Sequence, residues 1–105
     1  MKVQVVYFDG CPSWHAAAER MRHALDATGH AAVVVELVEV SSPEDAVALR
    51  FAGSPTLLVD GKDLFPGAAP IAAMACRLYA GPSGFSDAPT LDALSAALRG
   101  LPPQE

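Results

Sequence analysis

Apolar and polar positions in the N-terminal part of the chain follow first a strand pattern, then a helical one, then a strand pattern again. Residues 2–8 form a continuous apolar run rich in valine and aromatic side chains, which is typical of a strand buried on both faces. Residues 13–28 carry apolar side chains at helical spacing along one face, with Pro12 at the first helical position and Gly29 as the stop. Residues 31–40, with three consecutive valines, predict a second strand that is also covered on both faces.

The middle of the chain predicts a short helix followed by a hairpin. Ser42 fits an N-cap and is followed by a proline and two acidic residues, so a helix is expected to run through Phe51 and to end at Gly53. Residues 56–59 predict a third strand. The Asp-Gly pair that follows is a favoured two-residue hairpin turn, leading into a fourth strand at residues 62–65.

Residues 66–89 contain four prolines and several glycines, which exclude long regular elements. Within this insert, residues 71–79 fit either a short helix or the approach to a strand at 76–79, and both alternatives stay open. Beyond it, Thr90 is a suitable N-cap for a last amphipathic helix that ends at Gly100. Its inward-facing residues are expected to be Leu91, Leu94 and Leu98.

The resulting order is β-α-β-α-β-β, then the insert, then a final helix. A strand, a crossover helix and a parallel strand followed by a hairpin predict a central mixed four-stranded sheet with helices on both faces. The length of 105 residues fits a single α/β domain spanning residues 1–105.

Composition narrows the classes of partner. The hydrophobic fraction of 51% predicts a compact domain, and the net charge of −5 with unclustered basic residues argues against nucleic acid. A run of about 18 apolar residues, as a membrane span requires, does not occur in the sequence. The N-terminus has no signal-peptide pattern, so a cytoplasmic location is expected. Two cysteines in that compartment favour catalysis or metal binding over a structural disulfide.

Cys11 is the candidate reactive residue. It lies between the first strand and the start of the first helix, where the helix dipole and free backbone N–H groups favour a thiolate. The other cysteine, Cys76, lies in the insert. It is either a resolving thiol or a small buried hydrophobic residue.

Four short motifs carry a resemblance to a known family. These are Tyr-Phe-Asp-Gly-Cys-Pro at 7–12, Gly-Ser-Pro-Thr at 53–56, Val-Asp-Gly-Lys at 59–62 and Cys-Arg-Leu-Tyr at 76–79. With the order of elements, they resemble the thioredoxin-like superfamily over most of the chain. More narrowly, they are similar to short bacterial proteins described as thioredoxin-family or loosely alkylmercury-lyase-like.

This resemblance implies a thiol-dependent oxidoreductase. Cys11 matches the cysteine that attacks a disulfide, and Pro55 resembles the cis-proline whose preceding residue, Ser54, pairs with an extended ligand. The implied partner is a small-molecule thiol or a protein disulfide, with glutathione as a candidate co-substrate and no other cofactor. Tyr7, Pro12, Ser54 and Pro55 are the residues expected to contact it.

The motif departs from the family at Trp14, which stands where a second cysteine is usual. Exchange within a Cys-x-x-Cys pair is therefore impossible, and either monothiol chemistry or resolution by Cys76 remains. A disulfide between Cys11 and Cys76 needs Cα atoms about 4.4–6.8 Å apart. The sequence does not show whether the folded chain brings them that close.

Two other functions fit the same residues. Cys11, Cys76 and the carboxylate of Asp9 are a suitable set for a soft metal or an organomercurial, because thiolates select soft metals. Alternatively, the chain is a non-catalytic binding module, with a homodimer left open, since the usual second cysteine is missing.

Overall fold

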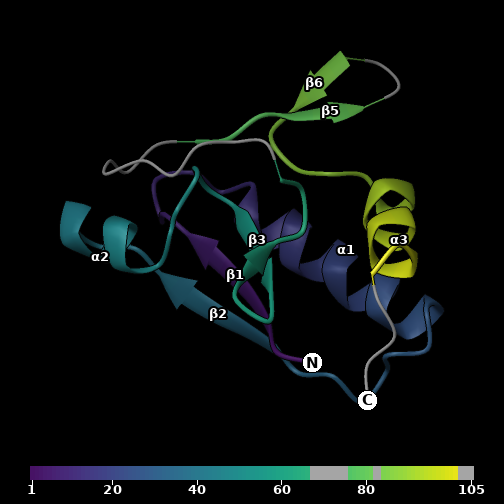
Figure 1. The fold of residues 1–105 in the computed structure, drawn as a ribbon. Helices are drawn as coiled ribbons and strands as arrows, with labels where there is room; N and C mark the ends of the chain where they lie inside the picture. Colours follow the sequence, from purple (N-terminus) through teal and green to yellow (C-terminus); the bar gives the residue numbers. More distant parts are fainter. Residues whose placement is uncertain (67–75, 82–83, 102–105) are drawn as a thin grey trace.

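A mixed four-stranded sheet lies at the centre of the protein in the computed structural model, which describes residues 1–66, 76–81 and 84–101 (Figure 1). The strand order is β2-β1-β3-β4. β1 pairs parallel with β2 and antiparallel with β3, and β3 pairs antiparallel with β4. The predicted α/β class and mixed sheet are confirmed. The strands are β1 (Val3–Tyr7), β2 (Val35–Glu39), β3 (Thr56–Val59) and β4 (Lys62–Asp63).

Helices cover both faces of this sheet, as the sequence predicts. The continuous apolar run of β1 serves both faces because successive side chains of a strand point in opposite directions. Val3 and Val5 pack with α1 and α3, whereas Val6 packs with α2 and Phe51 on the other face. The helices of the described residues are α1 (Trp14–Ala27), α2 (Pro43–Ala48) and α3 (Leu91–Arg99).

The second strand differs from the expectation. β2 is shorter than residues 31–40 and is partly exposed rather than covered on both faces. Leu37 within it is 51% exposed, and Val34, just before it, is 74% exposed. The reason is its position at the sheet edge, where β2 has a neighbouring strand on one side only. Valine content favours a strand there but does not decide how that strand is covered.

Three helix boundaries or faces also differ. α1 begins at Trp14 with Ser13 as its N-cap, so Pro12 precedes the helix instead of occupying its first position. α2 ends at Ala48 rather than at Phe51, because Arg50 takes a left-handed conformation with φ 54°. In α3, Thr90 caps the helix as expected. Of the three leucines expected to face inward, Leu94 and Leu98 are buried, whereas Leu91 is 42% exposed.

A second, two-stranded antiparallel sheet lies between β4 and α3 in the chain, at the top of Figure 1. Its strands are β5 (Tyr79–Gly81) and β6 (Gly84–Ser86), so only Tyr79 falls within residues 71–79, where the sequence leaves helix and strand open. Residues 71–75 of that stretch lie outside the described residues. The expected fourth strand at 62–65 is shorter, at Lys62–Asp63.

None of the helices among the described residues is both long enough and apolar enough to span a membrane.

Candidate functional site

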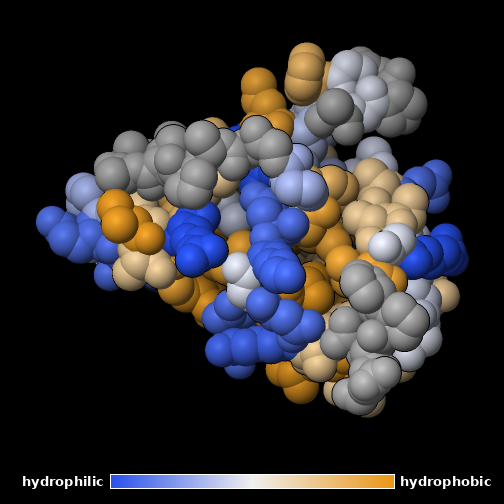
Figure 2. All heavy atoms as spheres, viewed as in Figure 1, coloured by the Kyte–Doolittle hydropathy of each residue, from blue (hydrophilic) through white to orange (hydrophobic). Residues whose placement is uncertain are grey.

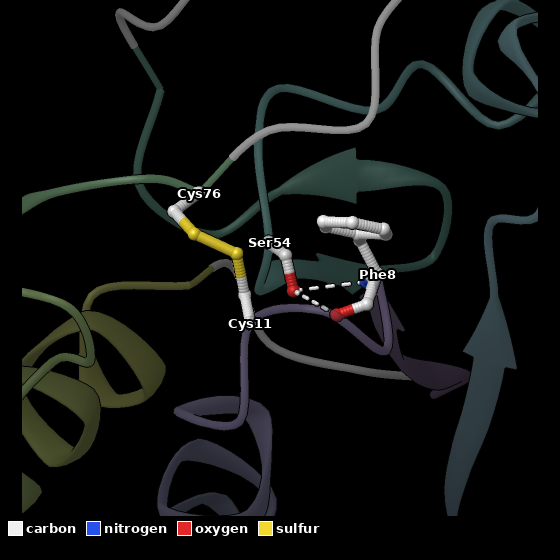
Figure 3. Close-up of a disulfide and its surroundings, with 4 residues drawn as sticks. All are labelled: Phe8, Cys11, Ser54 and Cys76. Carbon is white, nitrogen blue, oxygen red and sulfur yellow. Dashed lines mark hydrogen bonds between the residues drawn. A yellow bond between two sulfur atoms is a disulfide. The ribbon is translucent and has the colours of Figure 1, made fainter.

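A disulfide joins Cys11 to Cys76, which are 65 residues apart in the sequence (Figure 3). The Cα atoms are 5.9 Å apart, within the range that a disulfide requires. Cys11 lies in the turn between β1 and α1, where its N–H donates to the carbonyl of Phe8 at 3.0 Å. Cys76 lies on the extended segment that leads into β5. The folded chain therefore brings the two predicted cysteines together.

The two cysteines differ in their access to solvent. Cys11 is 2% exposed, whereas Cys76 belongs to the exposed residues. The hypothesis that Cys76 is a small buried hydrophobic residue is therefore wrong. One side of the disulfide faces the interior and the other faces the surface.

Ser54 connects the segments that carry the two cysteines. Its hydroxyl accepts a hydrogen bond from the N–H of Phe8 at 2.9 Å, which fixes the end of β1 just before Cys11 (Figure 3). Its backbone forms a parallel bridge with Cys76, and its carbonyl accepts from the N–H of Arg77 at 3.0 Å. Ser54 thus aligns both cysteines at once.

The Ser54–Pro55 peptide bond is cis, and both residues are fully buried. The resemblance implies that the backbone before this proline is free to pair with a ligand. In this structure the chain's own residues Cys76 and Arg77 occupy that pairing position. The direct role of Ser54 and Pro55 in substrate binding stays a prediction, and their observed contacts are internal.

The buried side chain of Arg77 anchors the segment that carries Cys76. The residue is 7% exposed and its guanidinium forms an ion pair with Asp63 at 2.7 Å. It also donates to the carbonyl of Phe65 at 2.7 Å and lies 4.6 Å from the centre of the Tyr79 ring. A buried cation needs such partners, because its desolvation is costly without them.

Tyr79 provides a second anchor. Its hydroxyl donates to the carbonyl of Pro55, and its ring packs edge-on against Phe65 with centroids 5.3 Å apart. Burial raises the pKa of Tyr79 above its ordinary value, and the nearby Arg77 cation only partly opposes that shift. The hydroxyl therefore stays protonated and remains a donor over the whole neutral range.

Gly53 allows the anchored segment to approach closely. Its φ is +107°, a conformation that residues with a side chain rarely adopt. A Cβ atom at this position would lie 2.7 Å from Cβ and 3.1 Å from Cα of Arg77. Glycine is therefore required both by the backbone angle and by the packing.

The other predicted contact residues are Tyr7, at the end of β1, and Pro12, in the turn before α1. Tyr7 is half-buried and stacks on Trp14, with ring centroids 4.1 Å apart, and Trp14 in turn stacks on His15 at 3.6 Å. Pro12 is exposed directly after Cys11. Whether either residue contacts a substrate stays a prediction.

Sequence reasoning missed Asp63, Arg77 and Tyr79 as parts of this site. The last two belong to the Cys-Arg-Leu-Tyr motif, but their burial depends on Asp63 and Pro55 from other elements. The alternation of polar and apolar residues after Cys76 predicts that Leu78 faces inward and Arg77 outward, which is the reverse of the observed burial. It is also too short to distinguish a strand from a turn.

Two other features of the described residues bear on ligand binding. Groups of three or more His, Cys, Asp or Glu side chains that could hold a metal do not occur among them, and Asp9 is exposed. A cavity of about 400 Å³ is lined by Arg50, Leu58 and Lys62, among others, but by neither cysteine. Comparison of the chain with family models, curated proteins and solved structures finds no match.

Proposed function

We propose that the protein is a thiol–disulfide oxidoreductase of thioredoxin-like fold whose redox pair is Cys11 and Cys76. The observation that carries the proposal is the disulfide between a buried and an exposed cysteine, aligned by one serine. The missing second cysteine of the Cys-x-x-Cys motif is then replaced by a cysteine from the segment beside Pro55.

Several features support this assignment. The order of the first four strands and two helices agrees with the resemblance, and the thiol lies after β1 with a cis-proline just before β3. A purely structural disulfide does not need one exposed cysteine. Exposed disulfides are more often the labile, regulatory or catalytic ones.

The buried neighbours have a defined role in this mechanism. Arg77 and Tyr79 hold the Cys76 segment against Asp63 and Pro55 without using the disulfide. We expect these anchors to keep Cys76 close to Cys11 after reduction, so that the bond can form again. Such preorganisation is what allows one cysteine to resolve a mixed disulfide on the other.

The test is a redox titration of the purified protein in buffers of reduced and oxidised glutathione, followed by acid quenching, alkylation and intact mass measurement. The expected result is a reversible change between a form that lacks two hydrogens and carries no alkyl group and a form with two alkyl groups. The Cys76→Ala variant, as control, should give a single alkyl group or a glutathione adduct at Cys11.

Three outcomes would contradict the proposal. A disulfide that stays closed in native protein until urea is added would be a structural disulfide. Two freely alkylated cysteines under every oxidising condition would leave monothiol chemistry or a binding module. Stoichiometric binding of mercury by the reduced protein, without any disulfide cycle, would favour the soft-metal hypothesis instead.

A further inference from the structure

We infer that Cys76, rather than Cys11, is the sulfur that exchanges with the partner, and that this partner is a protein thiol flanked by apolar side chains. The inference rests on the proposed thiol–disulfide exchange and adds to it the point of entry and the class of substrate. It reverses the roles that the position of Cys11 suggests.

The difference in exposure carries the first part. Thiol–disulfide exchange requires the attacking thiolate to reach one sulfur of the disulfide, so its rate depends on access to that sulfur. Cys11 is 2% exposed in the turn between β1 and α1, whereas Cys76 is exposed. A thiol from outside therefore meets Cys76 first, and Cys11 becomes the leaving group.

The segment after Cys76 presents alternate residues to solvent. Arg77 and Tyr79 are 7% and 5% exposed and make the internal contacts described above, whereas Leu78 is 66% exposed. In an extended segment, residues two apart lie on the same face. Leu78 therefore lies on the outward face with Cys76, held there by the anchors on either side.

Phe85 extends this face onto the hairpin. It is 75% exposed and precedes Ser86, which lies on β6 directly opposite Tyr79 of β5. Directly opposite residues of an antiparallel pair share a face and successive residues alternate, so Phe85 lies on the face opposite that of Tyr79, as Leu78 does. Figure 2 shows apolar side chains gathered on the hairpin at the top of the molecule. We define Leu78 and Phe85 as the apolar face.

An apolar face beside the exchanging sulfur fits an apolar protein segment better than glutathione. Glutathione is small, carries two carboxylates and one ammonium group, and would need a cation to recognise it. The cation nearest in sequence to Cys76, Arg77, points inward and is paired with Asp63. A leucine or phenylalanine next to the partner's cysteine could instead cover Leu78 and Phe85.

The proposed exchange has two steps. A partner thiolate attacks the Cys76 sulfur, a bond forms between the two, and the Cys11–Cys76 bond breaks with its electron pair leaving on the Cys11 sulfur. A second thiolate of the same partner then attacks its own bonded sulfur and releases Cys76 as thiolate. The partner dithiol is oxidised to a disulfide and the protein is reduced; a disulfide-bearing partner drives the reverse reaction.

Trapping the intermediate tests the point of entry. Oxidised wild-type protein is mixed with a limiting peptide that has one cysteine between two leucines, quenched with acid early in the reaction, and mapped by mass spectrometry. The adduct is expected on Cys76, with Cys11 free. In single-cysteine variants, Cys11→Ser should react with the oxidised peptide about tenfold faster than Cys76→Ser.

An adduct mainly on Cys11, in wild-type protein, would overturn the assignment of Cys76. The wild-type experiment also covers the case in which Cys76→Ser loosens the fold and exposes Cys11. If the protein never cycles in glutathione buffers but the adduct still forms on Cys76, the proposed function fails and the point of entry stands.

The class of partner is tested by comparing that peptide with glutathione on wild-type, Leu78→Ser and Phe85→Ser proteins. Both substitutions should slow exchange with the peptide about fivefold and leave the rate with glutathione unchanged. Val47→Ser is the matched control, since Val47 is 62% exposed on α2, and it should change neither rate. Equal slowing with both thiols, or none, would overturn the apolar-partner proposal.

Discussion

Gly53 offers the sharpest test of how the Cys76 segment is held. Replacing it by alanine combines two penalties that the structure separates. The angle φ of +107° is unfavourable for any residue with a Cβ atom, at about 1–2 kcal/mol. The added Cβ also meets Cβ of Arg77 at 2.7 Å and its backbone N at 3.2 Å, so rotation of the arginine side chain cannot relieve the overlap.

Overpacking of this kind costs about 1–3 kcal/mol, so Gly53→Ala is expected to lower the free energy of unfolding by about 2–5 kcal/mol in total. Gly29→Ala is the matched control. Gly29 has a φ of +84° but nothing lies within 4 Å of its added Cβ, so that variant should lose about 1–2 kcal/mol.

The assay has two parts. The first is urea unfolding of both variants in the oxidised form, and the second is the rate at which the disulfide closes again after reduction. Gly53→Ala should also close the Cys11–Cys76 bond more slowly than wild type, because the overlap pushes the Arg77 segment away from Ser54. Gly29→Ala should close it at the wild-type rate. Equal losses of stability in the two variants, with equal rates of closure, would refute the close approach as the reason for glycine at position 53.

Three further predictions concern the bonds around the disulfide. Reduction of the Cys11–Cys76 bond, which spans 65 residues, should lower the unfolding free energy by about 4 kcal/mol, whereas a variant with both cysteines replaced by serine should not respond to reductant. Tyr79→Phe should lose about 1 kcal/mol at pH 8, because the donor to Pro55 is removed. The wild-type protein should lose stability above about pH 10, because burial raises the folded pKa of Tyr79 and the unfolded chain releases this proton first. Tyr79→Phe should lose less stability over the same pH range. Parallel curves of unfolding free energy against pH for the two proteins would count against this cause. Asp63→Asn should lower the free energy of unfolding in urea by about 2 kcal/mol. This is less than the loss of a fully buried ion pair, because the Asp63 side chain is 20% exposed. An unchanged urea midpoint would show that the ion pair contributes nothing to stability.

The elements that the sequence predicted well are those whose signals are local. Ser42 and Thr90 cap their helices through their own side chains, which accept from the N–H groups of Asp45 and Ala93. The Asp-Gly turn joins β3 to β4 as expected, with φ of 52° and 80° at its two residues. Each of these contacts spans three residues or fewer, so the sequence contains nearly all the information they need.

The predictions that failed depend on what lies beside an element rather than within it. The valine-rich stretch at 31–40 indicates a strand, but its edge position leaves Leu37 half-exposed. Leu91 fits the apolar periodicity of α3, yet it precedes the part of the helix that packs on α1. Propensity and periodicity are properties of a segment itself, whereas its burial depends on the elements that pack beside it.

For the site, the sequence by itself determined which groups are available: a cysteine after the first strand, a proline before the third, and one further cysteine. Only the tertiary structure decided that Cys11 and Cys76 meet, that Ser54 aligns them, and that Cys76 is the exposed member. Phe8 and Ser54 are 46 positions apart in the sequence, and Cys11 and Cys76 are 65 positions apart. Closing loops of that length costs conformational entropy, which contacts in the buried core and those of Arg77 and Tyr79 offset. A local sequence pattern contains no information about these distant contacts.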